Sequence, residues 1–237
     1  MITHQATTTN SDTVGRASAS FSHNSGSGSE RGLFVCCKLR DDANAGASAV
    51  TYNGVGLTKA LNVEQEYSAG QWINVEWWYL ANPASGSNTV AVTYSHTLTA
   101  DEVTAVTLNG VEQSDPIGAS NSATGNSSGP AVSVTTEQAN AWILAGIGKR
   151  RAGGGSFTPG TGTTEVADGE TGTAGNADIS YFDGYETTTT AGAHTVDATH
   201  SVTSEWTMAA IEVKETTGGG TAVPVLAMHY RKLRMMS

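Results

Sequence analysis

Charged residues are scarce in this chain: they make up 14% of its 237 residues, against roughly 25% in a typical soluble protein. Serine, threonine, asparagine and 28 glycines take their place, which gives a polar, uncharged, loop-rich composition. The few charges are unbalanced, with a formal net charge of -10. Because an acidic surface repels phosphate backbones, we expect no nucleic-acid partner.

Cysteine is almost absent as well. Cys36 and Cys37 are the only two, and they are adjacent. Neighbouring residues in a strand point to opposite faces, so this pair cannot form an ordinary disulfide with itself. A secreted disulfide framework is therefore excluded. We expect both to behave as small apolar residues, as free cysteines usually do.

Long apolar runs are also missing. No stretch approaches the roughly 18 apolar residues of a membrane helix, and the first twenty residues carry neither a basic region nor an apolar one of the kind found in Sec signals. We therefore expect no membrane partner and synthesis in a host cytoplasm, with any export by another route such as lysis. The length suits one large all-β domain or two small ones.

The chain is organised around residues 71–95. Trp72 to Leu80 is dense in aromatic and β-branched residues, which favour a pleated, half-buried surface. After an Asn/Pro/Ser/Gly cluster, Thr89 to Tyr94 alternates with a period of two, as a strand with one wet face does. Two such runs predict a hairpin or a longer antiparallel connection. Trp77 and Trp78 must point to opposite faces, and we expect core packing, with stacking on sugars as the alternative.

Similar short runs recur along the chain, and no amphipathic helix is evident. Asn53-Gly54 predicts a type I′ hairpin turn, and Asp183-Gly184 predicts a turn inside residues 179–186. Residues 153–178 hold eight glycines and almost nothing apolar, which predicts a long surface excursion. About nine to eleven strands result, typical of an antiparallel sandwich or barrel.

No pattern in the sequence predicts catalysis. The Gly146 to Lys149 string lacks two required positions of a phosphate-binding loop. His194 and His200, on one strand face, would sit about 20 Å apart and cannot hold one metal. The paired acids at 41–42 and 101–102 lack the ligand spacing that calcium requires. We therefore expect no enzyme, no catalytic residue, no cofactor and no metal site.

The end of the chain differs from the acidic body. A glycine-rich hinge at 216–221 precedes an apolar and then basic tail at 222–237. Termini are often disordered, but exposed apolar side chains commonly serve as contact surfaces. The alternative to a disordered terminus is an arm that docks on another copy or another protein. The candidate interface residues are Val223, Val225, Leu226, Met228, Tyr230, Arg231, Lys232 and Arg234.

Several strings together resemble one family. They are Gly26 to Val35 (GSGSERGLFV), Val50 to Val55 (VTYNGV), Trp78 to Pro83 (WYLANP), Gly86 to Val90 (GSNTV) and Leu108 to Gln113 (LNGVEQ). The chain resembles, over roughly residues 20–215, a jelly-roll-like β-sandwich family of tailed-phage virion proteins and bacterial surface proteins. The excursion at 153–178 and the tail depart from that pattern.

The resemblance implies a structural or adhesive module without catalysis. We expect an antiparallel, jelly-roll-like β-sandwich at 21–215, preceded at 1–20 by an arm or a first strand. The expected function is that of a virion structural protein, most of all a capsid decoration or accessory head protein. Its partners would be other virion proteins and copies of itself. The alternative is a carbohydrate- or receptor-binding adhesin module of a tail fibre.

Overall fold

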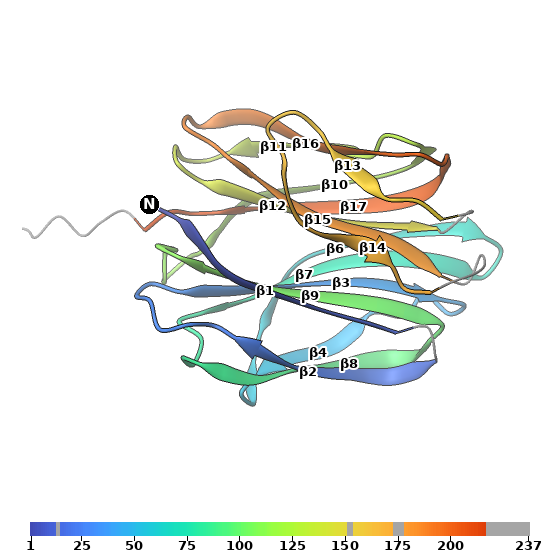
Figure 1. The fold of residues 1–237 in the computed structure, drawn as a ribbon, viewed down its shortest axis with the longest axis horizontal. Helices are drawn as coiled ribbons and strands as arrows, with labels where there is room; N and C mark the ends of the chain where they lie inside the picture. Colours follow the sequence, from blue (N-terminus) through green and yellow to red (C-terminus); the bar gives the residue numbers. More distant parts are fainter. Residues whose placement is uncertain (13–14, 151–153, 173–177, 217–237) are drawn as a thin grey trace, which may run out of the picture.

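The structure is a computed structural model that describes residues 1–12, 15–150, 154–172 and 178–216. These residues form seventeen β-strands in four antiparallel sheets. The sheets are stacked as four layers (Figure 1). The predicted all-β antiparallel sandwich is confirmed. The predicted count of nine to eleven strands is too low, because several polar stretches that lack alternation still pair as strands.

The first half of the chain forms one sandwich. A five-stranded sheet in the order β1-β9-β3-β7-β6 faces a four-stranded sheet in the order β2-β8-β4-β5. The strands are β1 (Thr3–Asp12), β2 (Arg16–Asn24), β3 (Gly32–Asp41), β4 (Ala47–Tyr52), β5 (Val55–Gly56), β6 (Thr58–Ser68), β7 (Gln71–Ala81), β8 (Ser87–Leu98) and β9 (Ala100–Asn109).

The second half forms another sandwich. Its five-stranded sheet runs β10-β17-β12-β15-β14, and its outer sheet runs β11-β16-β13. The strands are β10 (Ile117–Ser127), β11 (Ala131–Thr136), β12 (Trp142–Arg150), β13 (Phe157–Pro159), β14 (Thr164–Glu170), β15 (Ile179–Thr187), β16 (Gly192–His200) and β17 (Ser204–Val213). The two five-stranded sheets face each other at the centre of the stack (Figure 1).

The two halves share one topology. In each, the chain crosses repeatedly between the two sheets, and equivalent strands take the same places in the sheets, with β5 of the first sandwich lacking a counterpart in the second; this is the connectivity of a jelly roll. A bulge in β6 lies opposite Trp77, and a bulge in β14 lies opposite Asp183, so these residues are equivalent. Trp77 pairs with Cys36 and Asp183 pairs with Gly146, which makes Cys36 and Gly146 equivalent too. The expectation of one sandwich over 21–215 did not anticipate this internal repeat.

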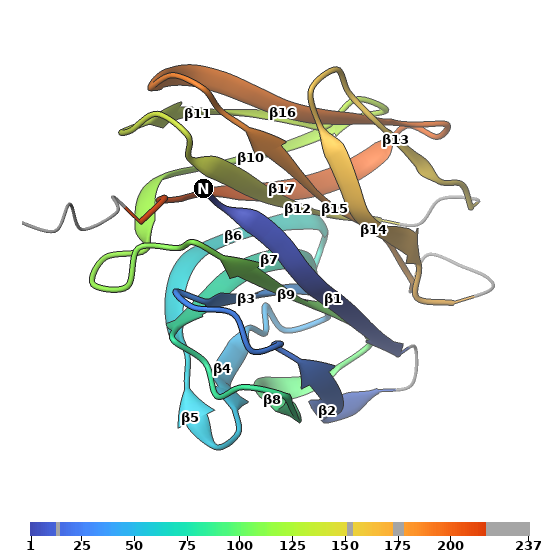
Figure 2. The same ribbon diagram turned by 60° about the vertical axis from the view of Figure 1, so that its left-hand side comes forward.

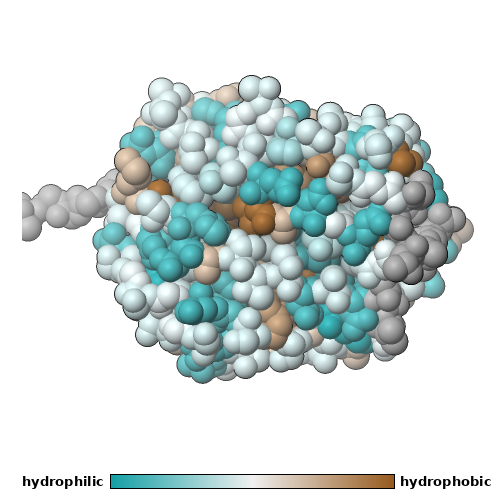
Figure 3. Space-filling view, in the orientation of Figure 1, coloured by the Kyte–Doolittle hydropathy of each residue, from teal (hydrophilic) through white to brown (hydrophobic). Residues whose placement is uncertain are grey.

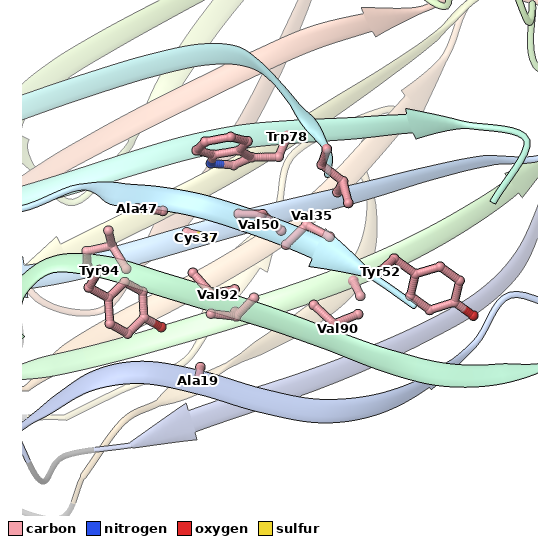
Figure 4. Packing of buried hydrophobic residues seen from close by; sticks show 14 of the residues in the cluster. Ala19, Val35, Cys37, Ala47, Val50, Tyr52, Trp78, Val90, Val92 and Tyr94 are labelled. Atoms are coloured by element: carbon pink, nitrogen blue, oxygen red, sulfur yellow. The ribbon is translucent and has the colours of Figure 1, made fainter. Parts of the chain in front are cut away.

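Three large apolar cores separate the four layers, and a small fourth cluster of Ala100, Ile179 and Tyr181 lies beside the second. The first lies inside the first sandwich, where side chains of β3 and β7 meet those of β4 and β8 (Figure 4). The second joins the two central sheets, and the third fills the second sandwich. Trp78 belongs to the first core and Trp77 to the second, so the two rings do point to opposite faces and both are covered. Cys37 belongs to the first core and Cys36 to the second, and both are free and buried.

The turn predictions have mixed outcomes. Asn53 and Gly54 have φ values of 50° and 76°, which confirms the type I′ hairpin between β4 and β5. The turn predicted at Asp183-Gly184 is wrong, because both residues lie inside the continuous strand β15. The surface excursion predicted at 153–178 is also partly wrong. Phe157 enters the third core, and β14 pairs along the edge of β15.

Both ends of the described chain lie at one pole. Residues 1–20, expected as an arm or a first strand, contain β1, which pairs with β9 along the edge of the first central sheet. The amino group of Met1 forms an ion pair with Glu215, and Glu215 forms a β-bridge with Val111. Figure 2 shows the N-terminus beside the end of the second sandwich. The chain therefore continues beyond Thr216 from the same pole at which it begins.

Candidate functional site

The residues predicted as a partner interface lie outside the described part of the chain. All eight belong to 222–237, and the structure describes nothing beyond Thr216. The predicted docking arm therefore stays a prediction.

The histidines considered as metal ligands are separate. His194 lies 3.2 Å from the Glu186 carboxylate, whereas His200 packs on the ring of Phe157. Both lie on β16. In the described ranges, no group of three or more histidine, cysteine or acidic side chains could hold a metal ion.

The outer surface of the described residues carries few apolar side chains. Met1 and Val55 are the large hydrophobic residues that are exposed there, at 88% and 52%. Figure 3 shows one face on which polar and neutral residues predominate. No helix among the described residues is long and apolar enough to cross a membrane.

The densest group of reactive side chains is buried between the two sandwiches, and we call Lys38, Glu102, Asp183 and Thr104 the central cluster. The Lys38 amine donates to Glu102 Oε2 at 2.6 Å and to Asp183 Oδ2 at 2.5 Å. The first two side chains are fully buried and that of Asp183 is 2% exposed. Lys38 and Glu102 are register partners on β3 and β9, whereas Asp183 comes from β15 of the other sandwich.

The hydrogen bonds of the cluster require an extra proton. The Thr104 hydroxyl lies 2.5 Å from Glu102 Oε1 and 2.7 Å from Asp183 Oδ2. A hydroxyl has one hydrogen to donate, so it cannot donate to both carboxylates. One carboxyl group must instead donate to Thr104. Burial raises the pKa of Glu102 to about 7, so Glu102 can hold this proton near neutral pH, and we assign the proton to it.

One oxygen of the cluster is left over. Asp183 Oδ1 is buried and has no hydrogen-bond partner among the described residues. The charges of the neighbouring Asp183 and Glu102 outweigh the opposing effect of burial and hold the pKa of Lys38 well above its ordinary value. The arrangement therefore places an amine, a carboxylate and a protonated carboxyl group in mutual contact, away from water.

The other buried acids have structural roles. Glu76 accepts hydrogen bonds from the Trp78 indole and from Lys59. Asp101 accepts from Arg16 and Tyr94. These groups pair the strands of one sandwich and bring no amine and acid of the two sandwiches together.

Comparisons with protein families, curated proteins and solved structures found no match to this chain. The resemblance to phage virion proteins therefore rests on the short strings in the sequence alone. Any function is argued from the geometry and from those strings.

Sequence reasoning missed the central cluster. The sequence places Asp183 in a predicted turn and gives Glu102 only as one of the paired acids at 101–102. Lys38 gave one usable signal, since it is the single charge within the apolar run from Gly32 to Leu39. A lysine at a core position needs a buried acid, but the sequence did not indicate which acid it meets.

Proposed function

We propose that this protein is a structural component of a tailed-phage virion, most of all a capsid decoration or accessory head protein. The observation that supports this best is the four-layer body, whose buried acids are engaged within the fold. Such a body suits a rigid spacer or clamp. The strings that resemble the virion family support the same assignment.

The surface and the chain ends suggest how neighbours would be held. With two large apolar side chains exposed among the described residues, the body offers little apolar docking area. The segment 222–237 combines apolar residues with three basic ones, Arg231, Lys232 and Arg234. It follows a pole shared with the N-terminus, so we infer that neighbouring virion proteins, or further copies of this chain, are held at that pole.

Incorporation into particles tests the proposal. We expect the full chain to be found in purified particles of its parent phage, and a chain ending at Thr216 to be lost from them. Limited proteolysis gives a second measurement: cleavage after Arg231 or Lys232 should slow on the particle relative to the free protein. Absence of the full chain from particles, or equal cleavage rates in the two states, would contradict the proposal.

Two matched tail variants separate apolar from charge contacts. One replaces Val223, Val225 and Leu226 with serine, and the other replaces Arg231, Lys232 and Arg234 with glutamine. The apolar variant should lose incorporation at any salt concentration. The charge variant should lose incorporation already at low salt and depend less on salt than the wild type, since the charge contacts that salt screens are gone.

The adhesin alternative lacks a favouring observation. It requires exposed aromatic rings, and in the described residues no aromatic side chain is among the exposed large apolar ones. A glycan array with the full chain gives the deciding outcome. Specific glycan binding together with absence from heads would favour the tail-fibre alternative.

A further inference from the structure

We propose that Lys38 and Asp183 condense to an amide bond, so that a covalent link joins the two sandwiches through their common core. The geometry that carries this is the contact of the lysine amine with the aspartate carboxylate, 2.5 Å from Nζ to Oδ2, inside a cluster buried from solvent. The proposal does not depend on the virion function.

The two reacting atoms are close enough to form a bond. The carbon Cγ lies one carbon–oxygen bond from Oδ2, so Nζ is within about 3.7 Å of it. Reactive arrangements in enzymes have separations of about 3–3.5 Å. Lys38 and Asp183 come from facing central sheets, which hold both side chains in place. Holding two reactants in contact gives them an effective concentration far above that of free reactants in solution.

The reaction needs a neutral amine, although Lys38 is held as a cation in this cluster: burial lowers its pKa, and the charges of Asp183 and Glu102 outweigh that effect and raise it. A lysine cation and a carboxylate lose their hydration when they are buried, and this penalty opposes the attraction between them. Proton transfer from Lys38 to Asp183 gives a neutral amine and a neutral acid, which cost less to bury. Cys36 and the ring of Tyr181 lie beside the Lys38 amine as apolar neighbours. The centroid of the Tyr181 ring is 5.9 Å from Nζ.

Glu102 is placed to move the proton. The Lys38 nitrogen attacks Asp183 Cγ, and a carbon–nitrogen bond forms. Glu102, bonded to Nζ at 2.6 Å, accepts a proton from that nitrogen and delivers its acid proton to the departing oxygen. The carbon–oxygen bond breaks and one water molecule leaves. Overall, an ammonium and a carboxylate become an amide and water, so atoms and charge balance without an oxidant or a co-reactant.

Thr104 and Asp183 Oδ1 fit the same step. Thr104 contacts Oδ2 at 2.7 Å and holds the carboxyl group against the amine. Thr104 also links Glu102 Oε1 to Oδ2, so the acid proton passes through Thr104 to Oδ2, which leaves as water. The unpartnered Oδ1 stays behind as the amide oxygen. Formation of the amide would remove the charges of Lys38 and Asp183 from the core and leave Glu102 protonated.

The sandwich repeat shows that the cluster is an addition to the fold. By the register, Lys38 is equivalent to Gly148 and Glu102 to Thr207, and Asp183 is equivalent to Trp77. The second sandwich therefore folds with uncharged groups at the two positions equivalent to Lys38 and Glu102. The jelly-roll-like topology does not itself require this buried amine and its acids.

The intact mass of the full chain tests the proposal directly. We expect the wild-type protein, denatured before measurement, to weigh one water molecule less than its sequence. Asp183→Ala and Lys38→Arg should both show the full sequence mass. Asp183→Asn should lose ammonia in place of water, which no merely structural role explains. A wild-type mass equal to that of the sequence overturns the proposal.

Peptide mapping covers variants that fail to fold, because it uses the wild type alone. Trypsin cannot cut after an acylated lysine, so residues 32–40 should stay intact and be joined to residues 152–214. Separate peptides 32–38 and 152–214 as the only products contradict the link.

A cut between the sandwiches gives a second readout. Ser114 and Asp115 are exposed between β9 and β10, and a protease site inserted there separates the halves. The cut wild type should run as one band on a denaturing gel, whereas Asp183→Ala should give two. Glu102→Gln should form the link far more slowly, over hours to days after folding. Equal, immediate linkage in that variant would remove Glu102 from the step.

Discussion

Gly146 allows the two sandwiches to approach, and Gly146→Ala tests that contact. A Cβ at this position would lie 2.3 Å from the sulfur of Cys36, far inside van der Waals contact. The next neighbours, on Asp183 and Lys38, are at 3.3 and 3.4 Å. The clash is therefore with one atom, and that atom belongs to the equivalent position of the other sandwich.

The magnitude follows from two opposing effects. Overpacking a tight core costs about 1–3 kcal/mol. Replacing glycine by alanine at an unstrained backbone position stabilises by about 0.4–1 kcal/mol through the unfolded chain. We expect Gly146→Ala to destabilise the protein by about 1–2 kcal/mol. Cys36→Ala should cost about 1 kcal/mol for the lost buried sulfur.

The combination of the two substitutions gives the decisive result. With the sulfur removed, the new Cβ fills the space, so Gly146→Ala should stabilise the Cys36→Ala protein by about 0.5–1 kcal/mol. Denaturant unfolding of the wild type, both single variants and the double variant measures this coupling. Gly56→Ala is the matched control, because a Cβ there meets nothing within 4 Å. If Gly146→Ala destabilises the Cys36→Ala protein as much as it destabilises the wild type, the two effects are additive and the face-to-face contact is refuted.

Three further predictions concern other parts of the body. Burial lowers the pKa of His23 to about 4, so between pH 6.5 and 4 the unfolded chain binds more protons than the folded protein. The free energy of unfolding should therefore fall by about 2 kcal/mol as the pH drops through this range. Urea unfolding measures this, and His23→Gln should flatten the pH profile. Phe157→Ala should cost about 3–5 kcal/mol, whereas the exposed Thr158→Ala should change stability by less than about 0.5 kcal/mol; equal effects would place residues 157–159 outside the core. The Glu212 carboxylate accepts the backbone N–H of Ala119 in β10 and those of Glu137 and Gln138 just after β11. Glu212→Gln should therefore cost about 2 kcal/mol in thermal unfolding, and an unchanged midpoint would contradict that role.

Short-range patterns predicted much of the fold. The apolar run at 32–39, the alternation at 89–94 and the Asn53-Gly54 turn each carry their conformation in a few neighbouring residues. β10 and β14 could not be found in this way, since their residues are polar or small and their strand form depends on pairing with β17 and β15. Phe157, a lone apolar residue among glycines, gave too weak a signal for a core position.

The repeat and the central cluster depend on tertiary structure. Many equivalent positions hold unlike residues, such as Trp77 and Asp183, and the few that match, such as Tyr79 and Tyr185, are too scattered to reveal the repeat in the sequence. Lys38 and Asp183 are 145 positions apart, and no local pattern connects them. The eight tail residues are predicted as a partner interface from composition alone. They lie outside the described residues, so the interface stays a prediction.

A high-resolution crystal structure of the full chain tests the central claim most directly, namely that Lys38 and Asp183 join two facing sandwiches. The account predicts continuous density from Lys38 Nζ to Asp183 Cγ, with a bond of about 1.33 Å as in any amide. Separate side chains joined only by a hydrogen bond would contradict the link, and central sheets that do not face each other would contradict the fold on which it depends.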